Sequence, residues 1–293
     1  MKKCGEYVLV GLLVSALFSG FASCAPADSS VPPDCEVKET YVSNAEAAIY
    51  GKTYLPKSKR REKMPAVILS HSSSLTCDSM NAYAVGFAER GYVAYAFDFC
   101  GGSDKSRSDG KTEDMTVFTE VSDLKAVVDA VSAFEFVDES AVYLFGTSQG
   151  GLVSALAAED SADKVRGMIL CYPAFNIPDM VAMMDESASS ESGSGAAFGS
   201  FGSAGEAFIE TMRGYDVYAH IGGFAGKVLI LHGTKDFIVP YSYSTRAAEQ
   251  YADCTLHLIS GASHGFNAEN YSFSGNYDEE VWEQIDGYFA SAA

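Results

Sequence analysis

The chain has 293 residues, of which 47% are hydrophobic, and it carries a formal net charge of −19. This length and composition are sufficient for a full core, and α/β enzymes of about 200–250 residues commonly form a single domain. The acidic balance argues against nucleic acid or an anionic membrane surface as a partner, because both would repel the protein. These quantities leave the oligomeric state open.

The N-terminal residues read as a targeting segment. Two lysines precede an apolar run from Val8 to Phe18, and small residues follow it. This order is typical of a signal peptide, and the run is shorter than the about 20 residues of a spanning helix. The alternative is a membrane anchor that is not cleaved. The segment Phe21-Ala22-Ser23-Cys24 resembles a bacterial lipobox, so we expect residues 1–24 to be a lipoprotein-type signal peptide, with lipid on Cys24 as the only membrane attachment.

The expected location is therefore the bacterial cell envelope, with a periplasmic or secreted protein as the alternative. Residues 25–36 contain prolines and small or polar residues and are predicted to be a flexible tether. Five cysteines lie beyond the signal peptide and show no metal-binding or redox spacing. Export would permit one disulfide among them, and the odd number leaves at least one free thiol.

From residue 37 to the C-terminus, strands and helices alternate, and the central strands are almost continuously apolar. We predict two antiparallel strands within 37–55 and further strands at 66–69, 92–99, 142–145, 165–172, 228–231 and 255–259. We predict helices at 81–90, 116–136, 149–159, 243–251 and 278–289. Apolar strands alternating with helices indicate a mostly parallel, doubly wound sheet in one domain that spans 37–293.

The regular pattern stops at 176–225, after the sixth strand. The centre of this insert, 187–205, consists almost entirely of Gly, Ser and Ala. It is too long for an ordinary strand-to-helix connection, which indicates either a lid or a disordered insertion. The insert leaves the carboxyl edge of the sheet, where ligands bind in such folds. We therefore expect its apolar flanks, with Met183 and Phe208, to cover a substrate pocket.

The segment Gly146-Thr147-Ser148-Gln149-Gly150 lies between a predicted strand and a predicted helix. Gly-x-Ser-x-Gly in this context is the pattern of a nucleophile elbow, which exposes the serine hydroxyl in a sharp turn. The alternative is an ordinary glycine-rich turn. A serine nucleophile needs a base, and the base needs an orienting acid, in the chain order serine, acid, histidine.

Elimination among five histidines favours His264 as the base. It lies in a polar loop after the last predicted strand, whereas the others lie at strand ends, within a strand or in the insert. Asp236, on the loop after the preceding strand, is the candidate acid, because neighbouring loops at one sheet edge can bring the two side chains together. The alternatives are a surface histidine and a turn aspartate.

Together, Gly-Thr-Ser-Gln-Gly-Gly, His-Gly-Thr-Lys-Asp-x-x-Val-Pro and Ser-His-Gly-Phe resemble the α/β-hydrolase superfamily. The segment Asp98-Phe99-Cys100-Gly101-Gly102-Ser103 is more specifically similar to bacterial cinnamoyl (feruloyl) esterases. The resemblance implies an α/β-hydrolase fold and an oxyanion hole formed by the backbone N–H groups of Ser73 and Gln149. The chain departs from the family's usual His-Gly-aromatic by reading His71-Ser72-Ser73, and its lid is extended.

The expected function is a serine esterase that acts on small acyl or aromatic esters through an acyl-enzyme. Neither a metal site nor a phosphate-binding motif is found, so no cofactor is expected. Alternatives on the same triad are a prolyl-oligopeptidase-type peptidase, a thioesterase and an acyltransferase, because fold does not fix function. A surface binding protein on a hydrolase scaffold is the non-enzymatic alternative.

Overall fold

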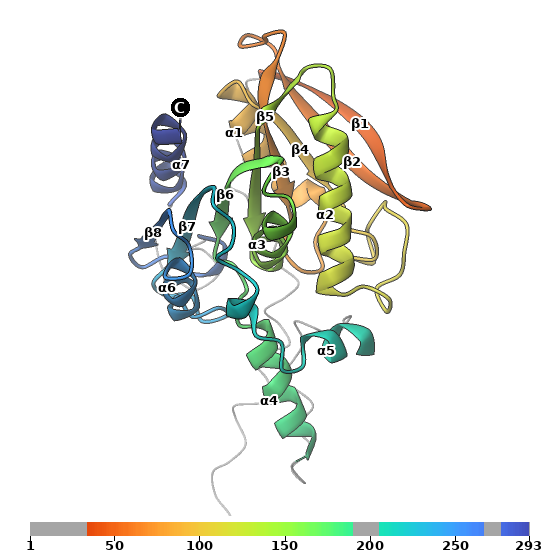
Figure 1. Ribbon diagram of the computed structural model, residues 1–293, viewed down its shortest axis with the longest axis vertical. Helices are drawn as coiled ribbons and strands as arrows, with labels where there is room; N and C mark the ends of the chain where they lie inside the picture. Colours follow the sequence, from red (N-terminus) through yellow and green to blue (C-terminus); the bar gives the residue numbers. More distant parts are fainter. Residues whose placement is uncertain (1–33, 190–204, 267–276, 293) are drawn as a thin grey trace, which may run out of the picture.

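The computed structural model describes residues 34–189, 205–266 and 277–292 (Figure 1). The predicted signal peptide, Cys24 and most of the predicted tether lie outside the described residues. The same holds for most of the Gly/Ser-rich centre of the insert. None of the described helices is long and apolar enough to cross a membrane.

A single eight-stranded sheet forms the centre of the molecule, in the order β1-β2-β4-β3-β5-β6-β7-β8. β1 pairs antiparallel with β2, β2 pairs antiparallel with β4, and all other pairings are parallel. The mostly parallel sheet that the sequence predicts is thus confirmed. The strands are β1 (Cys35–Asn44), β2 (Ala47–Pro56), β3 (Met64–Ser70), β4 (Val93–Phe97), β5 (Val137–Thr147), β6 (Val165–Cys171), β7 (Lys227–Gly233) and β8 (Cys254–Ile259). β1 begins at Cys35 and therefore includes the last two residues of the predicted tether.

Helices cover both faces of the sheet, as the apolar strands require (Figure 1). One hydrophobic cluster joins the sheet to α2 (Val117–Ser132), α3 (Gln149–Asp160) and α6 (Ser242–Ala248). A second cluster joins the opposite face to α1 (Asn81–Glu89) and α7 (Asp278–Ala292). Short 3-10 helices lie at Cys77–Met80 (η1), Val217–Ala219 (η2) and His264–Phe266 (η3).

Helix α2 begins where its capping residues place it. The Thr116 hydroxyl accepts a hydrogen bond from the backbone N–H of Thr119, and the Thr119 hydroxyl accepts one from the N–H of Thr116. This reciprocal capping satisfies N–H groups that have no partner within the helix. It fixes the start of α2, whose first turns carry the buried Glu120 and Asp123.

The flanks of the insert form helices α4 (Ile177–Ser189) and α5 (Glu206–Met212), which lie beyond the carboxyl end of the sheet (Figure 1). We expected the apolar flanks to cover a substrate pocket, yet Phe208 and the neighbouring Met212 belong to the core. Both side chains are buried in the cluster that contains α2 and α3, because α5 packs against α2. Met183, by contrast, is 59% exposed.

The described cysteines are all free thiols, so no disulfide is present among them: Cys35, Cys77, Cys100, Cys171 and Cys254.

Candidate active site

Ser148 lies in the sharp turn between β5 and α3. Its backbone has φ +50° and ψ −118°, a strained conformation for a residue with a side chain. A Cβ atom on Gly146 would lie 2.3 Å from the carbonyl oxygen of Gly150, and one on Gly150 would lie 2.3 Å from the carbonyl oxygen of Ser70. Both glycines are therefore required by close backbone approaches, which explains the spacing of the motif around the serine.

The structure brings the three sequence-predicted residues Ser148, His264 and Asp236 together. The Oγ of Ser148 lies 3.1 Å from Nε2 of His264, and Nδ1 of His264 lies 2.7 Å from Oδ2 of Asp236. Asp236 follows β7 and His264 follows β8, and these strands are parallel neighbours whose carboxyl ends meet at one sheet edge. All three side chains belong to residues that are at least 92% buried, with exposed fractions of 8%, 8% and 6%.

The Asp236 carboxyl group is held on both sides. Its Oδ1 accepts hydrogen bonds from the backbone N–H groups of Ile238 and Val239, at 2.9 and 2.8 Å. Its Oδ2 lies 3.2 Å from Nε2 of His232 as well as near His264. Burial alone would raise the pKa of Asp236, but the hydrogen bonds from the two histidines and the backbone hold it below its ordinary value. The carboxylate is thus ionised and oriented toward His264 at neutral pH.

Two residues beside the triad were not identified as part of the site from sequence. His232 was set aside as a candidate base because it lies at a strand end, yet it contacts the Asp236 carboxylate; its position four residues before Asp236 was the available signal. Tyr172 directly follows β6 and has a positive φ of 40°, and its ring packs edge-on against His264 with ring centroids 4.7 Å apart. No sequence pattern distinguishes this tyrosine, because its backbone conformation and its neighbour both come from tertiary packing.

The two expected oxyanion donors lie in the loop after β3 and at the start of α3. Among the described residues, the backbone N–H groups of Ser73 and Gln149 have no hydrogen-bond acceptor. The loop is fixed by His71, whose Nδ1 lies 2.8 Å from the carbonyl oxygen of Ser72. Nε2 of His71 accepts a hydrogen bond from the N–H of Phe99 at 3.2 Å, so Nδ1 carries the proton. Burial lowers the pKa of His71, which keeps the ring neutral.

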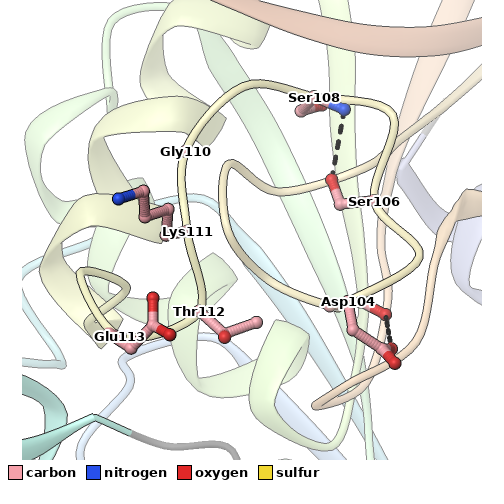
Figure 2. A pocket seen from close by; sticks show the side chains of 8 residues that line it. Asp104, Ser106, Ser108, Gly110, Lys111, Thr112 and Glu113 are labelled. Carbon is pink, nitrogen blue, oxygen red and sulfur yellow. Dashed lines mark hydrogen bonds between the residues drawn. The ribbon is translucent and has the colours of Figure 1, made fainter.

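A polar hollow of about 510 Å³ lies within the loop that connects β4 to α2 (Figure 2). The backbone of this loop curls around it, and hydrogen bonds within the loop, such as Ser108 N–H to Ser106 Oγ at 3.1 Å, hold that shape. None of the triad residues lines this hollow. The residues that line it are Ser103, Asp104, Ser106, Ser108, Gly110, Lys111, Thr112 and Glu113.

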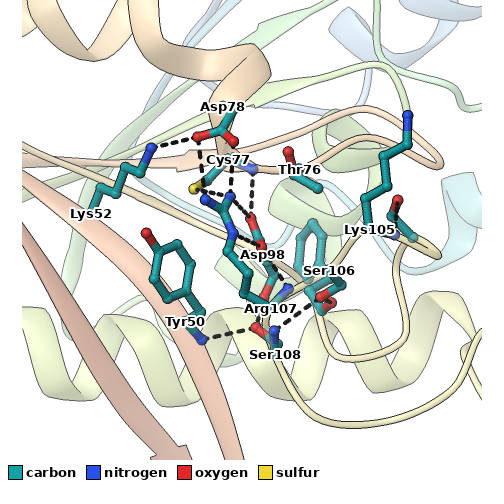
Figure 3. Close-up of polar contacts among 12 residues, drawn as sticks. Tyr50, Lys52, Thr76, Cys77, Asp78, Asp98, Lys105, Ser106, Arg107 and Ser108 are labelled. Carbon is teal, nitrogen blue, oxygen red and sulfur yellow. Dashed lines mark hydrogen bonds and ion pairs between the residues drawn. The ribbon is translucent and has the colours of Figure 1, made fainter.

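The base of the same loop is anchored by the buried Asp98 (Figure 3). Arg107 donates from Nε to Oδ2 of Asp98 at 2.9 Å and from Nη2 to Oδ1 at 3.1 Å. The backbone N–H of Cys77 also donates to Oδ1, at 2.7 Å. Although burial raises the pKa of Asp98, these donors hold it below its ordinary value. The ion pair thereby closes the loop after β4 on itself, and the hydrogen bond from Cys77 joins this loop to the segment after β3.

Comparisons with known proteins show which proteins this chain is similar to. A family model described as serine aminopeptidase, S33, matches residues 61–193. A search of curated proteins finds no match to the chain.

Among solved structures, the chain is similar to Est1E from Butyrivibrio proteoclasticus with ferulic acid bound, at 25% identity and a TM-score of 0.71. The matched region covers 86% of this chain and 98% of Est1E. Two further structures share the fold. The complex of DcsB with its substrate analogue matches at 18% identity and a TM-score of 0.68, covering 88% of this chain and 100% of DcsB. The Pyrococcus furiosus esterase Pf2001 matches at 16% identity and a TM-score of 0.62, covering 88% of this chain and 93% of Pf2001. The chain therefore has the α/β-hydrolase fold, and over residues 61–193 it is similar to the serine aminopeptidase family.

Proposed function

We propose that the protein is a carboxylic ester hydrolase that acts on small-molecule esters through an acyl-enzyme intermediate. The observation that carries this proposal is the hydrogen-bonded series from Ser148 through His264 to Asp236. The order and the nitrogen atoms match what general-base activation of a serine requires.

In this mechanism, Oγ of Ser148 attacks the ester carbonyl carbon while Nε2 of His264 takes the hydroxyl proton. Asp236 accepts the hydrogen bond from Nδ1–H and stabilises the imidazolium that forms. The backbone N–H groups of Ser73 and Gln149 bind the developing oxyanion, at about 3–4 kcal/mol of transition-state stabilisation each. His264 then protonates the departing alkoxide, and water hydrolyses the acyl-enzyme by the same route.

The proposed substrates are esters of small or aromatic acids, including hydroxycinnamates. This class is supported by the similarity to Est1E, whose structure contains ferulic acid, at 25% identity. Met183, exposed on α4 beyond the carboxyl end of the sheet, is the proposed contact to the acyl group from the insert. Phe208 acts indirectly in this proposal, because it is buried where α5 packs against α2.

A fluorophosphonate probe and a substrate panel test the proposal. The probe should label the wild-type protein and the control Ser140→Ala, whose serine is exposed and far along β5, but not Ser148→Ala. Hydrolysis of p-nitrophenyl acetate, p-nitrophenyl butyrate and methyl ferulate should show the same dependence on Ser148. An unlabelled wild type would exclude a serine hydrolase mechanism and favour a binding protein.

Peptide hydrolysis is a second candidate, because the matching family model is described as a serine aminopeptidase. The same triad would cleave an amide through the same steps. Aminoacyl and prolyl p-nitroanilides distinguish the two functions: turnover of these anilides above that of the esters would make the protein a peptidase.

A further inference from the structure

A buried carboxyl group lies beside the elbow and takes no part in the mechanism above. Glu120, in the first turns of α2, is 1% exposed. Among the described residues, no lysine, arginine or histidine forms an ion pair with it, although an isolated buried carboxylate is costly. Its position therefore requires an explanation other than a salt bridge.

The partner of Glu120 is the side chain of Gln149. Nε2 of Gln149 donates to Oε2 of Glu120 at 2.8 Å, and both residues are buried. The other polar atom of the same amide, Oε1 of Gln149, is also buried and has no hydrogen-bond donor. A buried amide oxygen without a protein donor is unusual in a native protein, because burial removes it from bulk water.

The protonation state of Glu120 resolves both observations. Burial raises its pKa to about 8; the Gln149 amide opposes that rise and the negative Asp123 adds to it. Asp123, on the same helix, is the one charged group of the described residues found to act on it. The neighbouring elements that the structure describes bring no further charge to Glu120. Cys100 contributes its backbone N–H, which donates to Asp123, and the first turn of α3, which contains Gln149, has no acidic or basic residue. At neutral pH the Glu120 carboxyl carries a proton, which makes it a donor as well as an acceptor.

We propose that Glu120 is a positioning residue that, as a neutral carboxylic acid, forms a two-point hydrogen-bonded pair with the Gln149 amide and thereby fixes the elbow. The amide N–H donates to Oε2 of Glu120, and the carboxyl O–H donates to Oε1 of Gln149. Gln149 is the first residue of α3, directly after the strained Ser148, and its backbone N–H is the proposed oxyanion donor. The pair thus ties α2 to the residue whose placement decides the geometry of the oxyanion hole. This role depends on the proposed function above.

The pair can be tested by exchanging its chemistry at nearly constant volume. Glu120→Gln replaces the acid by an amide that still offers one donor and one acceptor, so kcat should stay within about threefold of wild type. Glu120→Leu offers neither and should lower kcat about tenfold to a hundredfold with little change in KM, since small displacements in an active site are costly. A loss in Glu120→Gln equal to that in Glu120→Leu would mean that an ionised carboxylate is needed, and an unchanged kcat in Glu120→Leu would exclude a positioning role.

Exchanging the acid and the amide between positions 120 and 149 provides a second test. Gln149→Glu places two acids in the pair and should lower kcat, whereas Gln149→Glu combined with Glu120→Gln restores one acid and one amide and should recover it. Failure of the double variant to recover kcat, with near-UV circular dichroism like that of wild type, would overturn the two-point pair.

Infrared spectroscopy gives a readout that needs no substrate. The wild-type protein at pH 7 should show the carbonyl band of a protonated carboxylic acid, and Glu120→Gln should lack it. Absence of this band in wild type would overturn the proposal even where Glu120→Leu does not fold. A wild type with the band but without esterase activity would contradict the proposed function and leave the acid–amide pair intact.

Discussion

Replacing Glu120 by glutamine should stabilise the protein increasingly as the pH rises. In the unfolded chain the carboxyl group ionises with an ordinary pKa of 4.5, whereas burial raises the folded-state pKa to about 8. Between these values the unfolded state has lost the proton and the folded state still binds it. The free energy of unfolding of the wild type therefore falls as the pH rises through this window, and the contribution is fully present only below 4.5.

The magnitude follows from the two pKa values. At about 1.4 kcal/mol for each tenfold change in proton affinity, a pKa rise from 4.5 to about 8 corresponds to about 5 kcal/mol between acidic and alkaline pH. About 3 kcal/mol of this is lost by pH 7. Glu120→Gln has no such titration, so the difference in free energy of unfolding between variant and wild type should rise across the window and level off above pH 8.

Urea denaturation at pH steps from 4 to 9, with a reductant for the free thiols, measures this difference. The contributions of the other titrating groups, which both proteins share, cancel in the difference, except that of Asp123, whose charge acts on Glu120. Glu135→Gln, at an exposed glutamate just beyond the end of α2, shows the effect of removing a carboxylate from the surface. A difference between Glu120→Gln and wild type that does not vary with pH would mean that Glu120 is ionised in the folded protein, and the reasoning would be refuted.

Four further outcomes are expected. His264→Ala should lower ester kcat about as much as Ser148→Ala, by a factor on the order of 10⁴ or more, because triad members act as a unit; a residual rate of several per cent would contradict this. Arg107→Ala leaves a buried carboxylate unpaired and should lower the free energy of unfolding by about 3 kcal/mol in urea denaturation, and a loss under about 1 kcal/mol would contradict it. Met183→Gln should raise KM for methyl ferulate more than for p-nitrophenyl acetate, and equal effects would exclude an acyl contact. Metabolic labelling with a fatty acid should mark the wild type and not Cys24→Ser, whereas unlabelled wild type would indicate ordinary secretion.

The sequence by itself determined the fold class and the order of its elements. Continuous apolar runs such as 66–69 specify strands buried on both faces, and alternation with amphipathic helices leaves few arrangements besides a covered parallel sheet. The tight turn around Ser148 can likewise be recognised from the sequence, because only glycine fits at positions 146 and 150. The residue types and chain order then sufficed to select His264 and Asp236, which the structure brings within hydrogen-bond distance of one another.

Other features were decided only by tertiary structure. Phe208 was expected in a lid, because local sequence cannot show that α5 packs against α2 and buries it together with Met212. The contact of Tyr172 with His264 depends on the segments after two different strands, β6 and β8, coming together at one edge of the sheet. Glu120 reads as an ordinary polar residue of an amphipathic helix, and its protonation arises only because packing removes it from water beside Gln149. Sequence patterns report which residues must be buried, whereas the pairing of polar groups inside the core depends on distances that exist only after the chain has folded.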